Sequence, residues 1–290
     1  MAIKSLFTFG RAIRLRQWTK NLLVFSAPLF TFKPEIELWK GSFIGFIAFC
    51  LISSGIYLLN DVLDIESDKL HPTKKFRPIA KGEISKQNAI ILSATLIIIS
   101  LWISLISSTL LTLVLLTYLF IQLAYCIRFK KEPILDILCI SSGFLLRAIA
   151  GIASAELVFS PWFLLTVGLL ALFLAIEKRK AELRTSNKYG LKTRKVLERY
   201  SLPLLLRLES LVSTSAFLSY SLWASGPTLN GAPTKWMLIS VPFVLIGIFR
   251  YQLLSDPDES ERRKEINPEI SSEHPEEILL NDKGIKLTIL

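Results

Sequence analysis

Three aspartates stand at helical spacing where the second long apolar run of the chain ends. Asp61, Asp64 and Asp68 are spaced i, i+3 and i+7, so on a helix their carboxylates would line one face. Carboxylates on one stripe repel each other unless a cation lies among them, and Mg²⁺ prefers hard oxygen ligands shared with waters and a substrate diphosphate. Asn60 adds a neutral oxygen one residue earlier. The segment therefore predicts a magnesium–diphosphate site whose metal ligands come from Asn60, Asp61, Asp64 and Asp68.

Basic residues follow the aspartates in the same loop. Pro72 is expected to end the helix, and three cations come next at spacings of three and four, namely Lys74, Arg77 and Lys81. Such cations can clamp phosphate oxygens, and arginine can do so with two parallel hydrogen bonds. The alternative is a solvated, charge-balanced loop. Acids on one stripe followed by bases on another favour the diphosphate site.

Two charges lie inside the fifth apolar run. Asp136 and Arg147 are eleven residues apart, which at about 100° per residue returns to nearly the same helix face. Gly143 and Gly151 lie four residues before and after the arginine, and small residues at that spacing allow another backbone to approach closely. Charges inside a membrane are costly and usually functional, so Arg147 is a candidate phosphate ligand. A purely structural role for this arginine stays open.

The loop after the sixth apolar run begins with a second charged group. Lys178 and Arg179 concentrate positive charge at the end of that run, and Glu182 follows Lys178 by one helical turn. These helix-borne residues are candidates for the site, whereas the rest of the loop is typical of a solvated segment that faces lipid headgroups. Arg207 and Glu209 in the seventh run are better explained by snorkelling or by a local ion pair.

The elements that must carry these residues are membrane helices. Hydrophobic residues make up 51% of the 290 and charged residues only 20%, against roughly 25% charged in an average soluble protein. Residues 87–127 contain no Asp, Glu, Lys, Arg or His, and as a helix they would extend roughly 60 Å, enough for two crossings of a membrane. An ordinary soluble enzyme, a secreted disulfide scaffold and a disordered chain are therefore excluded. Three cysteines lie in apolar runs and are predicted to be small buried hydrophobic residues: Cys50, Cys126 and Cys139.

Apolar runs bounded by charges or turn residues predict an all-α, polytopic transmembrane helix bundle. Eight spans are expected, at residues 18–33, 39–59, 87–106, 109–127, 134–154, 160–177, 202–224 and 235–254. The N-terminal tail and the loops after even-numbered spans hold 23 Lys and Arg, and the loops on the other side hold 3. The positive-inside rule therefore places the N-terminus and the charged loops in the cytoplasm. We expect a catalytic transmembrane domain over residues 1–254 and a polar cytoplasmic tail over residues 255–290.

The aspartate motif and the two polar loops resemble those of the UbiA superfamily of intramembrane prenyltransferases. The pattern N-D-x-x-D-x-x-x-D at residues 60–68 is specific to the superfamily, and the resemblance covers nearly the whole chain. Finer motifs resemble the branch of decaprenyl-phosphate phosphoribosyltransferases, and they lie at residues 16–21, 71–78, 143–151, 160–163, 171–175, 178–183, 250–251 and 275–280. Prenyltransferases of the superfamily generally have a second aspartate motif after span six, where this chain has none. The highly charged residues 256–273 depart from the pattern of the phosphoribosyl branch.

The resemblance implies an enzyme with a UbiA-type bundle of eight or nine spans that uses Mg²⁺. It implies transfer of 5-phosphoribose from 5-phosphoribosyl 1-diphosphate to a polyprenyl (decaprenyl-type) phosphate, with release of pyrophosphate. The implied catalytic residues are Asp61, Asp64, Asp68, Arg77 and Lys178. The implied substrate-binding residues are Lys20, Asn60, Lys74, Arg77, Tyr125, Arg147, Lys178, Arg179 and Glu182.

Two rival functions stay open on the sequence. A UbiA-type prenyltransferase would use the same aspartates for a polyprenyl diphosphate and would alkylate an aromatic acceptor. A lipid-carrier transporter or scaffold would need no catalytic metal. For the favoured enzyme the expected partners are the membrane, a polyprenyl phosphate, 5-phosphoribosyl 1-diphosphate and a second copy of the chain in a homo-oligomer, without nucleic acid. The expected location is the bacterial inner (plasma) membrane, with the active site facing the cytoplasm.

Overall fold

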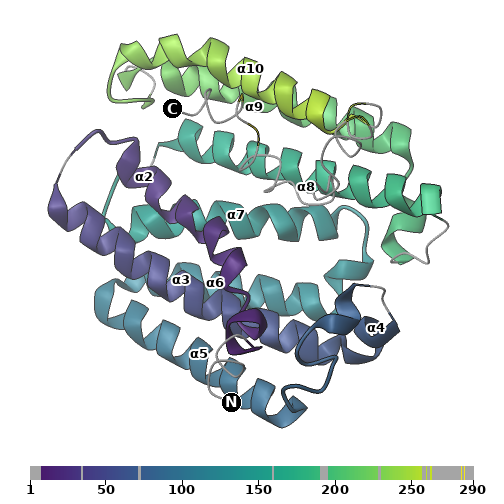
Figure 1. Ribbon diagram of the computed structural model, residues 1–290. Coiled ribbons are helices and arrows are strands. Elements are labelled where there is room, and N and C mark those ends of the chain that lie inside the picture. Colours follow the sequence, from purple (N-terminus) through teal and green to yellow (C-terminus); the bar gives the residue numbers. More distant parts are fainter. Residues whose placement is uncertain are drawn as a thin grey trace. The chain divides into compact units, whose positions relative to one another are not determined.

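The computed structural model describes residues 8–33, 35–70, 73–158, 160–189, 195–227 and 230–256, together with 259, 262, 282 and 284. Within these residues every regular element is a helix, which confirms the predicted all-α fold (Figure 1). The chain divides into two compact units. Unit 1 comprises Met1–Arg128 and Leu146–Val158, and unit 2 comprises Phe129–Leu145 and Phe159–Leu290.

Several sequence predictions fall outside the described residues. They concern Pro72, the motif at residues 275–280 and most of the charged stretch 256–273. The boundary between a domain over residues 1–254 and a tail over residues 255–290 stays a prediction.

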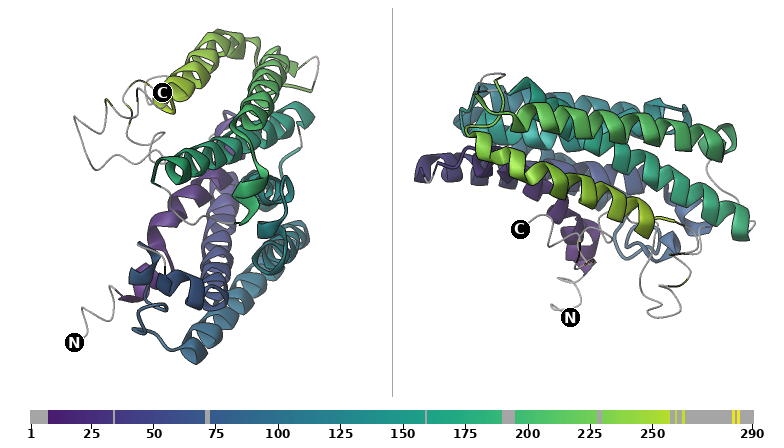
Figure 2. Two further views of the ribbon diagram at one scale, coloured as in Figure 1. Left: turned by 90° about the vertical axis from the view of Figure 1, so that its right-hand side faces the viewer. Right: turned by 90° about the horizontal axis from the view of Figure 1, so that it is seen from above.

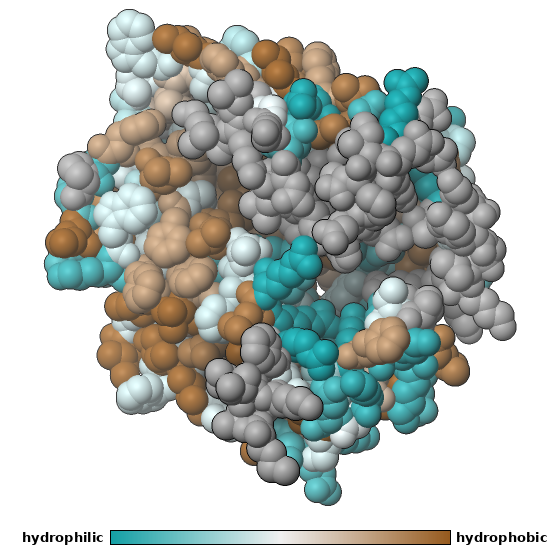
Figure 3. Space-filling view, in the orientation of Figure 1, coloured by the Kyte–Doolittle hydropathy of each residue, from teal (hydrophilic) through white to brown (hydrophobic). Residues whose placement is uncertain are grey.

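Unit 1 is organised around one long membrane helix, α3 (Ile36–Leu63), which packs beside α5 (Lys86–Ser107) (Figure 1). Ser108 forms the turn from α5 to α6, and its hydroxyl accepts the Leu111 N–H at 3.4 Å. The other elements of this unit are η1 (Leu15–Phe25), α2 (Ser26–Leu29), α4 (Ile65–Leu70), η2 (Lys74–Phe76), α6 (Thr109–Ile127) and the second half of α7 (Leu135–Ser154). In Figure 3 hydrophilic side chains gather near α4, whereas the flank near α3 and α5 is largely apolar.

Unit 2 contains α8 (Pro161–Tyr189) and α9 (Leu202–Ala224), which run side by side, with α10 (Val241–Leu254) next to α9 (Figure 2). Pro161 begins α8, where its missing N–H costs no intrahelical hydrogen bond. The remaining elements are the first half of α7, η3 (Phe129–Lys131), η4 (Lys195–Arg199) and η6 (Lys235–Ser240).

Seven helices among the described residues are long and apolar enough to cross a membrane, and they correspond to the second to eighth predicted spans. The first predicted span, residues 18–33, differs from the prediction. It forms the short elements η1 and α2 instead of one long helix. Pro28 contributes to this difference, because it has no backbone N–H to donate and so interrupts a longer helix.

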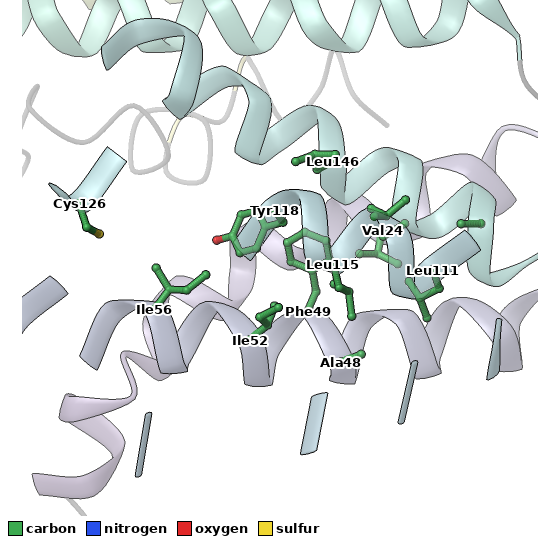
Figure 4. Close-up of a cluster of buried hydrophobic side chains, with 13 residues drawn as sticks. Val24, Ala48, Phe49, Ile52, Ile56, Leu111, Leu115, Tyr118, Cys126 and Leu146 are labelled. Carbon is green, nitrogen blue, oxygen red and sulfur yellow. The ribbon is translucent and has the colours of Figure 1, made fainter. Parts of the chain in front are cut away.

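The core of unit 1 explains why the glycine spacing on α7 matters. Figure 4 shows Phe49 and Tyr118 of this core side by side, and their ring centroids lie 4.7 Å apart. Val24 of η1 is fully buried in the same cluster. A Cβ atom added to Gly151 would lie 1.9 Å from the Val24 carbonyl oxygen, so only glycine allows this approach. The predicted close backbone contact on this face of α7 is confirmed.

Candidate functional site

The aspartates lie where α3 ends and α4 begins. Asp64 is the C-terminal cap of α3, and its N–H donates to the Asn60 carbonyl at 3.0 Å. The Asp68 N–H donates to the Asp64 carbonyl at 2.8 Å, which keeps a helical hydrogen bond across the break. The prediction that one helix holds all three aspartates is therefore wrong in detail, because α3 ends at Leu63 and Asp68 lies on α4.

Two of the three carboxylates converge on one cation. Arg77, just after η2, donates from Nη1 to Asp61 Oδ1 at 3.0 Å and to Asp68 Oδ2 at 2.6 Å. Both aspartates are buried, at 4% and 3% exposure, and such acids require a positive partner. The structure thus brings Arg77 to the aspartates, whereas its predicted contact with phosphate oxygens stays a prediction.

A second arginine reaches the same carboxylate from the N-terminal segment. Arg14 donates from Nη2 to Asp61 Oδ1, and its guanidinium lies 4.8 Å from the centre of the Tyr57 ring. We refer to Asp61, Asp68, Arg14 and Arg77 together as the acidic cluster. Sequence reasoning counted Arg14 only as one of the basic residues of the N-terminal tail. Its pairing with an aspartate 47 positions later carries no local sequence signal.

The donors at this helix end suit a hard cation. Among the side chains that the structure describes, no group of three or more His, Cys, Asp and Glu is arranged to hold a metal ion. One oxygen of Asp61 and one oxygen of Asp68 nevertheless contact the same nitrogen, Nη1 of Arg77. The two carboxylates can therefore surround a single positive centre. Asn60 and Asp64 are half-buried at the same junction. Carboxylate and amide oxygens are the donor set that Mg²⁺ prefers.

The lysines of the predicted clamp do not all join the acidic cluster. Lys81 pairs with Glu83 at 2.8 Å, and Arg11 donates to the same carboxylate at 2.5 Å. The hydrogen bond from Lys81, followed by that from Arg11, lowers the pKa of Glu83 below its ordinary value. Lys74 and Lys20 are half-buried. The structure thus separates Arg77, which contacts the aspartates, from Lys81, which forms a surface ion pair.

Arg147 is buried inside unit 1 with polar and aromatic partners. It donates from Nε to Asn21 Oδ1 at 2.7 Å and from Nη2 to the Tyr118 hydroxyl at 3.4 Å. Its guanidinium lies 5.1 Å from the Phe49 ring centre and 5.4 Å from that of Tyr118. Asn21 in turn donates to the Cys50 sulfur at 3.1 Å. These contacts tie η1, α3, α6 and α7 together and favour the structural interpretation of Arg147 that the sequence left open.

Tyr125 lies half-buried on α6, against the core of unit 1. The structure places it on the helix that also carries Tyr118. Its predicted role in substrate binding stays a prediction.

Unit 2 has a charged group of its own, centred on an arginine with no solvent exposure. Arg179 donates from Nε to Asp136 Oδ2 at 2.6 Å and contacts Glu182 through Nη1. The Tyr200 hydroxyl donates to Asp136 Oδ1 at 2.7 Å and accepts the Ile134 N–H at 2.6 Å. We refer to Asp136, Arg179, Glu182 and Tyr200 as the buried arginine cluster. Asp136 and Arg147, predicted to share a helix face, therefore have separate partners.

A third ionic group surrounds Lys180, which sequence reasoning did not single out. Lys180 donates to Glu177 at 2.6 Å and contacts Glu209, and Gln252 donates to Glu209 at 3.0 Å. Glu209 does form an ion pair, but its partner Lys180 lies on α8, 29 positions earlier, so the pair is not the local one that the sequence predicted. The i, i+3 spacing of Glu177 and Lys180 is typical of an ion pair on one helix face, so this contact could have been predicted from the sequence. Lys178 lies between Glu177 and Arg179 in the sequence, and its side chain is half-buried.

Fold and site together define the class: an all-helical, polytopic membrane protein with a carboxylate–arginine cluster at the polar end of a membrane helix. Residues 22–267 match the family model of the UbiA prenyltransferase family, and the chain belongs to this family. The predicted family resemblance is confirmed.

Relatives and solved structures agree with this assignment. The chain is 39% identical to the decaprenyl-phosphate phosphoribosyltransferase of Mycolicibacterium smegmatis, over 97% of this chain and 88% of that one. It is 36% identical to the protein of that name from Corynebacterium glutamicum, over 97% of this chain and 82% of that one. The fold is similar to a UbiA homologue from Archaeoglobus fulgidus bound to DMAPP and Mg²⁺, with a TM-score of 0.69, 19% identity and coverage of 84% and 85% of the two chains.

Proposed function

We propose that the protein transfers 5-phosphoribose from 5-phosphoribosyl 1-diphosphate to a polyprenyl phosphate of the decaprenyl type. The observation that carries this proposal is the near-full-length similarity to two decaprenyl-phosphate phosphoribosyltransferases. A second observation supports it. The polar end of α8 carries Lys178, Arg179 and Glu182 and lacks the aspartates that a second metal for a prenyl diphosphate would need.

The bond changes are those of a glycosyl transfer. A phosphate oxygen of the lipid attacks the anomeric carbon, and the bond from that carbon to the diphosphate breaks. Pyrophosphate leaves with the electron pair, and the product is polyprenylphosphoryl-5-phosphoribose. The attacking phosphate is already anionic, so the reaction requires no strong general base. The main demand on the protein is to stabilise the negative charge of the leaving diphosphate.

The acidic cluster and its neighbours suit that demand. Asp61 and Asp68, with Asp64 and Asn60, would hold a Mg²⁺ ion. A bound Mg²⁺ supplies electrostatic stabilisation of the leaving group. The Mg²⁺-bound homologue of this fold supports the choice of metal. Arg77 is 26% exposed in its side chain and can turn from the carboxylates to diphosphate oxygens.

Other predicted ligands divide according to burial. Lys20, Lys74, Tyr125 and Lys178 are half-buried, which leaves part of each side chain accessible to a sugar phosphate or the lipid phosphate. Lys178 stays in the proposal as a catalytic residue. Three predicted ligands stay in the proposal as positioning residues beside the phosphate site, without direct contact to phosphate, because each has buried protein partners: Arg147, Arg179 and Glu182.

The proposed setting is the bacterial plasma membrane, with the acidic cluster on the cytoplasmic side. Seven membrane-length helices in the described part of the chain support a multi-pass protein, and the excess of Lys and Arg in the loops after even-numbered spans supports the orientation. A homo-oligomer stays a prediction.

The test is a transfer assay on the purified full chain in lipid nanodiscs. The reaction contains Mg²⁺, decaprenyl phosphate and labelled 5-phosphoribosyl 1-diphosphate, and mass spectrometry identifies the lipid product. We expect a lipid carrying phosphoribose and an equal amount of pyrophosphate. No label in the lipid, together with turnover of a polyprenyl diphosphate and an aromatic acid, would contradict the proposal and favour the prenyltransferase.

A matched pair of variants separates an enzyme from a lipid-carrier scaffold. Asp64→Asn should lower the rate by about 10² or more with the fold intact, because a metal ligand is lost. Glu66→Gln alters an exposed acid two residues away that pairs with Lys69 at 3.0 Å, and it should leave the rate unchanged. Equal rates in both variants would contradict a metal site at this junction.

A further inference from the structure

Arg14 occupies a backbone conformation that arginine rarely adopts. Its φ is 54°, in the left-handed region where residues other than Gly, Asn and Asp are uncommon. The chain turns there between the helical residues 8–12 and η1, and the Gln17 N–H donates to the Arg14 carbonyl at 2.7 Å. The reason that an arginine occupies this position must lie in the contacts of its side chain.

That reason is not the anchoring of the N-terminal segment, which other contacts provide. The Trp18 indole donates to the Ser54 hydroxyl at 3.0 Å, and Ser54 donates to the Ile13 carbonyl at 2.9 Å. Asn21 holds η1 against α3 through Cys50. The turn places the Arg14 guanidinium over Tyr57 and against Asp61.

The charges of the acidic cluster balance one another. Two aspartates and two arginines alternate in the order Arg14, Asp61, Arg77, Asp68, and both arginines contact the same oxygen, Asp61 Oδ1. A divalent cation can reach that oxygen only if a guanidinium moves away. The Arg14 side chain is 23% exposed and the Asp61 side chain 5%, so the arginine is the partner with room to move.

We propose that Arg14 is a further substrate-binding residue, which exchanges Asp61 for a diphosphate oxygen when metal and diphosphate enter together. The inference deepens the proposed function and rests on it. Without diphosphate, Arg14 competes with a metal ion for Asp61. With diphosphate, the released guanidinium forms charge-assisted hydrogen bonds to the anion, so metal and diphosphate bind cooperatively.

The exchange predicts opposite changes in two binding constants of the Arg14→Gln variant. Mn²⁺ alone, titrated by electron paramagnetic resonance, should bind about fivefold more tightly because a competing cation is gone. Mn²⁺ with inorganic pyrophosphate should bind the anion about tenfold more weakly because a charged donor is gone. A merely structural arginine would weaken both or change neither.

Arg11→Gln is the matched control, because Arg11 lies on the same segment and pairs with Glu83 outside the acidic cluster. It should match the wild type in both titrations. If Arg14→Gln does not fold, Arg14→Lys carries the test. The shorter lysine lacks the forked donors, so shifts of the same two signs and smaller size are expected.

Two results would overturn the inference: Mn²⁺ affinity that does not rise in the folded variant, or pyrophosphate affinity that does not fall. Neither titration contains ribose or lipid. A wild-type protein that binds Mn²⁺ and pyrophosphate as described but transfers no phosphoribose would therefore contradict the proposed function and leave the Arg14 exchange in place.

Discussion

The acidic cluster of unit 1 and the buried arginine cluster of unit 2 use the same chemistry in different surroundings. Each joins arginine to two carboxylates. In the acidic cluster the arginine side chains are 23% and 26% exposed, for Arg14 and Arg77. In the buried arginine cluster Arg179 and Asp136 have no exposure at all.

The difference in exposure separates two roles for one kind of ion pair. Releasing a fully buried arginine from its acid leaves an uncompensated charge in a low-dielectric interior, which is strongly unfavourable. Releasing a partly exposed arginine costs less, because water or a substrate anion replaces the carboxylate. The acidic cluster can therefore change partners during a reaction, whereas the buried arginine cluster holds α8 and the start of α7 in place.

The largest effect is expected from Arg179→Met, which would leave Asp136 buried without its cation. We expect a loss of about 3–5 kcal/mol in the free energy of unfolding, measured by denaturant titration in detergent. Arg199→Met is the control, because Arg199 forms an exposed pair with Glu132 at 3.5 Å and should change stability by less than about 1 kcal/mol. A stable but inactive Arg179 variant would show that this arginine binds substrate and would remove the distinction between the clusters.

Next in size is Arg77→Gln, which removes the cation shared by Asp61 and Asp68. The value of kcat/KM for 5-phosphoribosyl 1-diphosphate should fall about 10²-fold, since a donor to the leaving group is lost. Lys81→Gln in the same loop should keep kcat/KM within about twofold, because Lys81 contacts Glu83 at the surface. Equal losses in both variants would indicate that the loop acts only through its total charge.

A smaller effect is expected from Tyr200→Phe in the buried arginine cluster. The change removes a donor to Asp136 and leaves the Ile134 N–H without its acceptor. The free energy of unfolding should fall by about 1–3 kcal/mol, with kcat unchanged. A loss of kcat at unchanged stability would contradict this prediction and would indicate that the buried arginine cluster takes part in catalysis.

The smallest effect concerns alkaline pH. Burial, and then the hydrogen bond to Asp136, raises the pKa of Tyr200 above its ordinary value. The unfolded chain therefore loses this proton first, at a pH of about 10, so the contribution of Tyr200 to stability declines as pH rises above that value. Unfolding midpoints measured from pH 9 to 11 should fall more steeply in the wild type than in Tyr200→Phe. Parallel curves would contradict the assignment.

Local sequence signals predicted the parts of the fold and site that depend on neighbours along the chain. The apolar runs predicted seven of the membrane helices, Ser108 marked a turn, and Gly151 marked a close backbone contact. The spacing of Asp61 and Asp68 placed both acids at one helix end, even though the helix breaks between them.

What the sequence did not predict depends on pairing between distant elements. Arg14 and Asp61 are 47 positions apart, and Lys180 and Glu209 are 29 apart. No periodicity within one helix reports such partners. Asn21 in the first predicted span is another example, because its partner Arg147 lies 126 positions later.

The central claim is that Asp61 helps to hold a divalent ion against the diphosphate. The direct test is electron–nuclear double resonance on Mn²⁺ bound to the protein with 5-phosphoribosyl 1-diphosphate, comparing wild type with Asp61→Asn. The claim predicts a ³¹P coupling in the wild type that disappears in the variant at equal Mn²⁺ concentration. An undiminished ³¹P coupling in folded Asp61→Asn would contradict it.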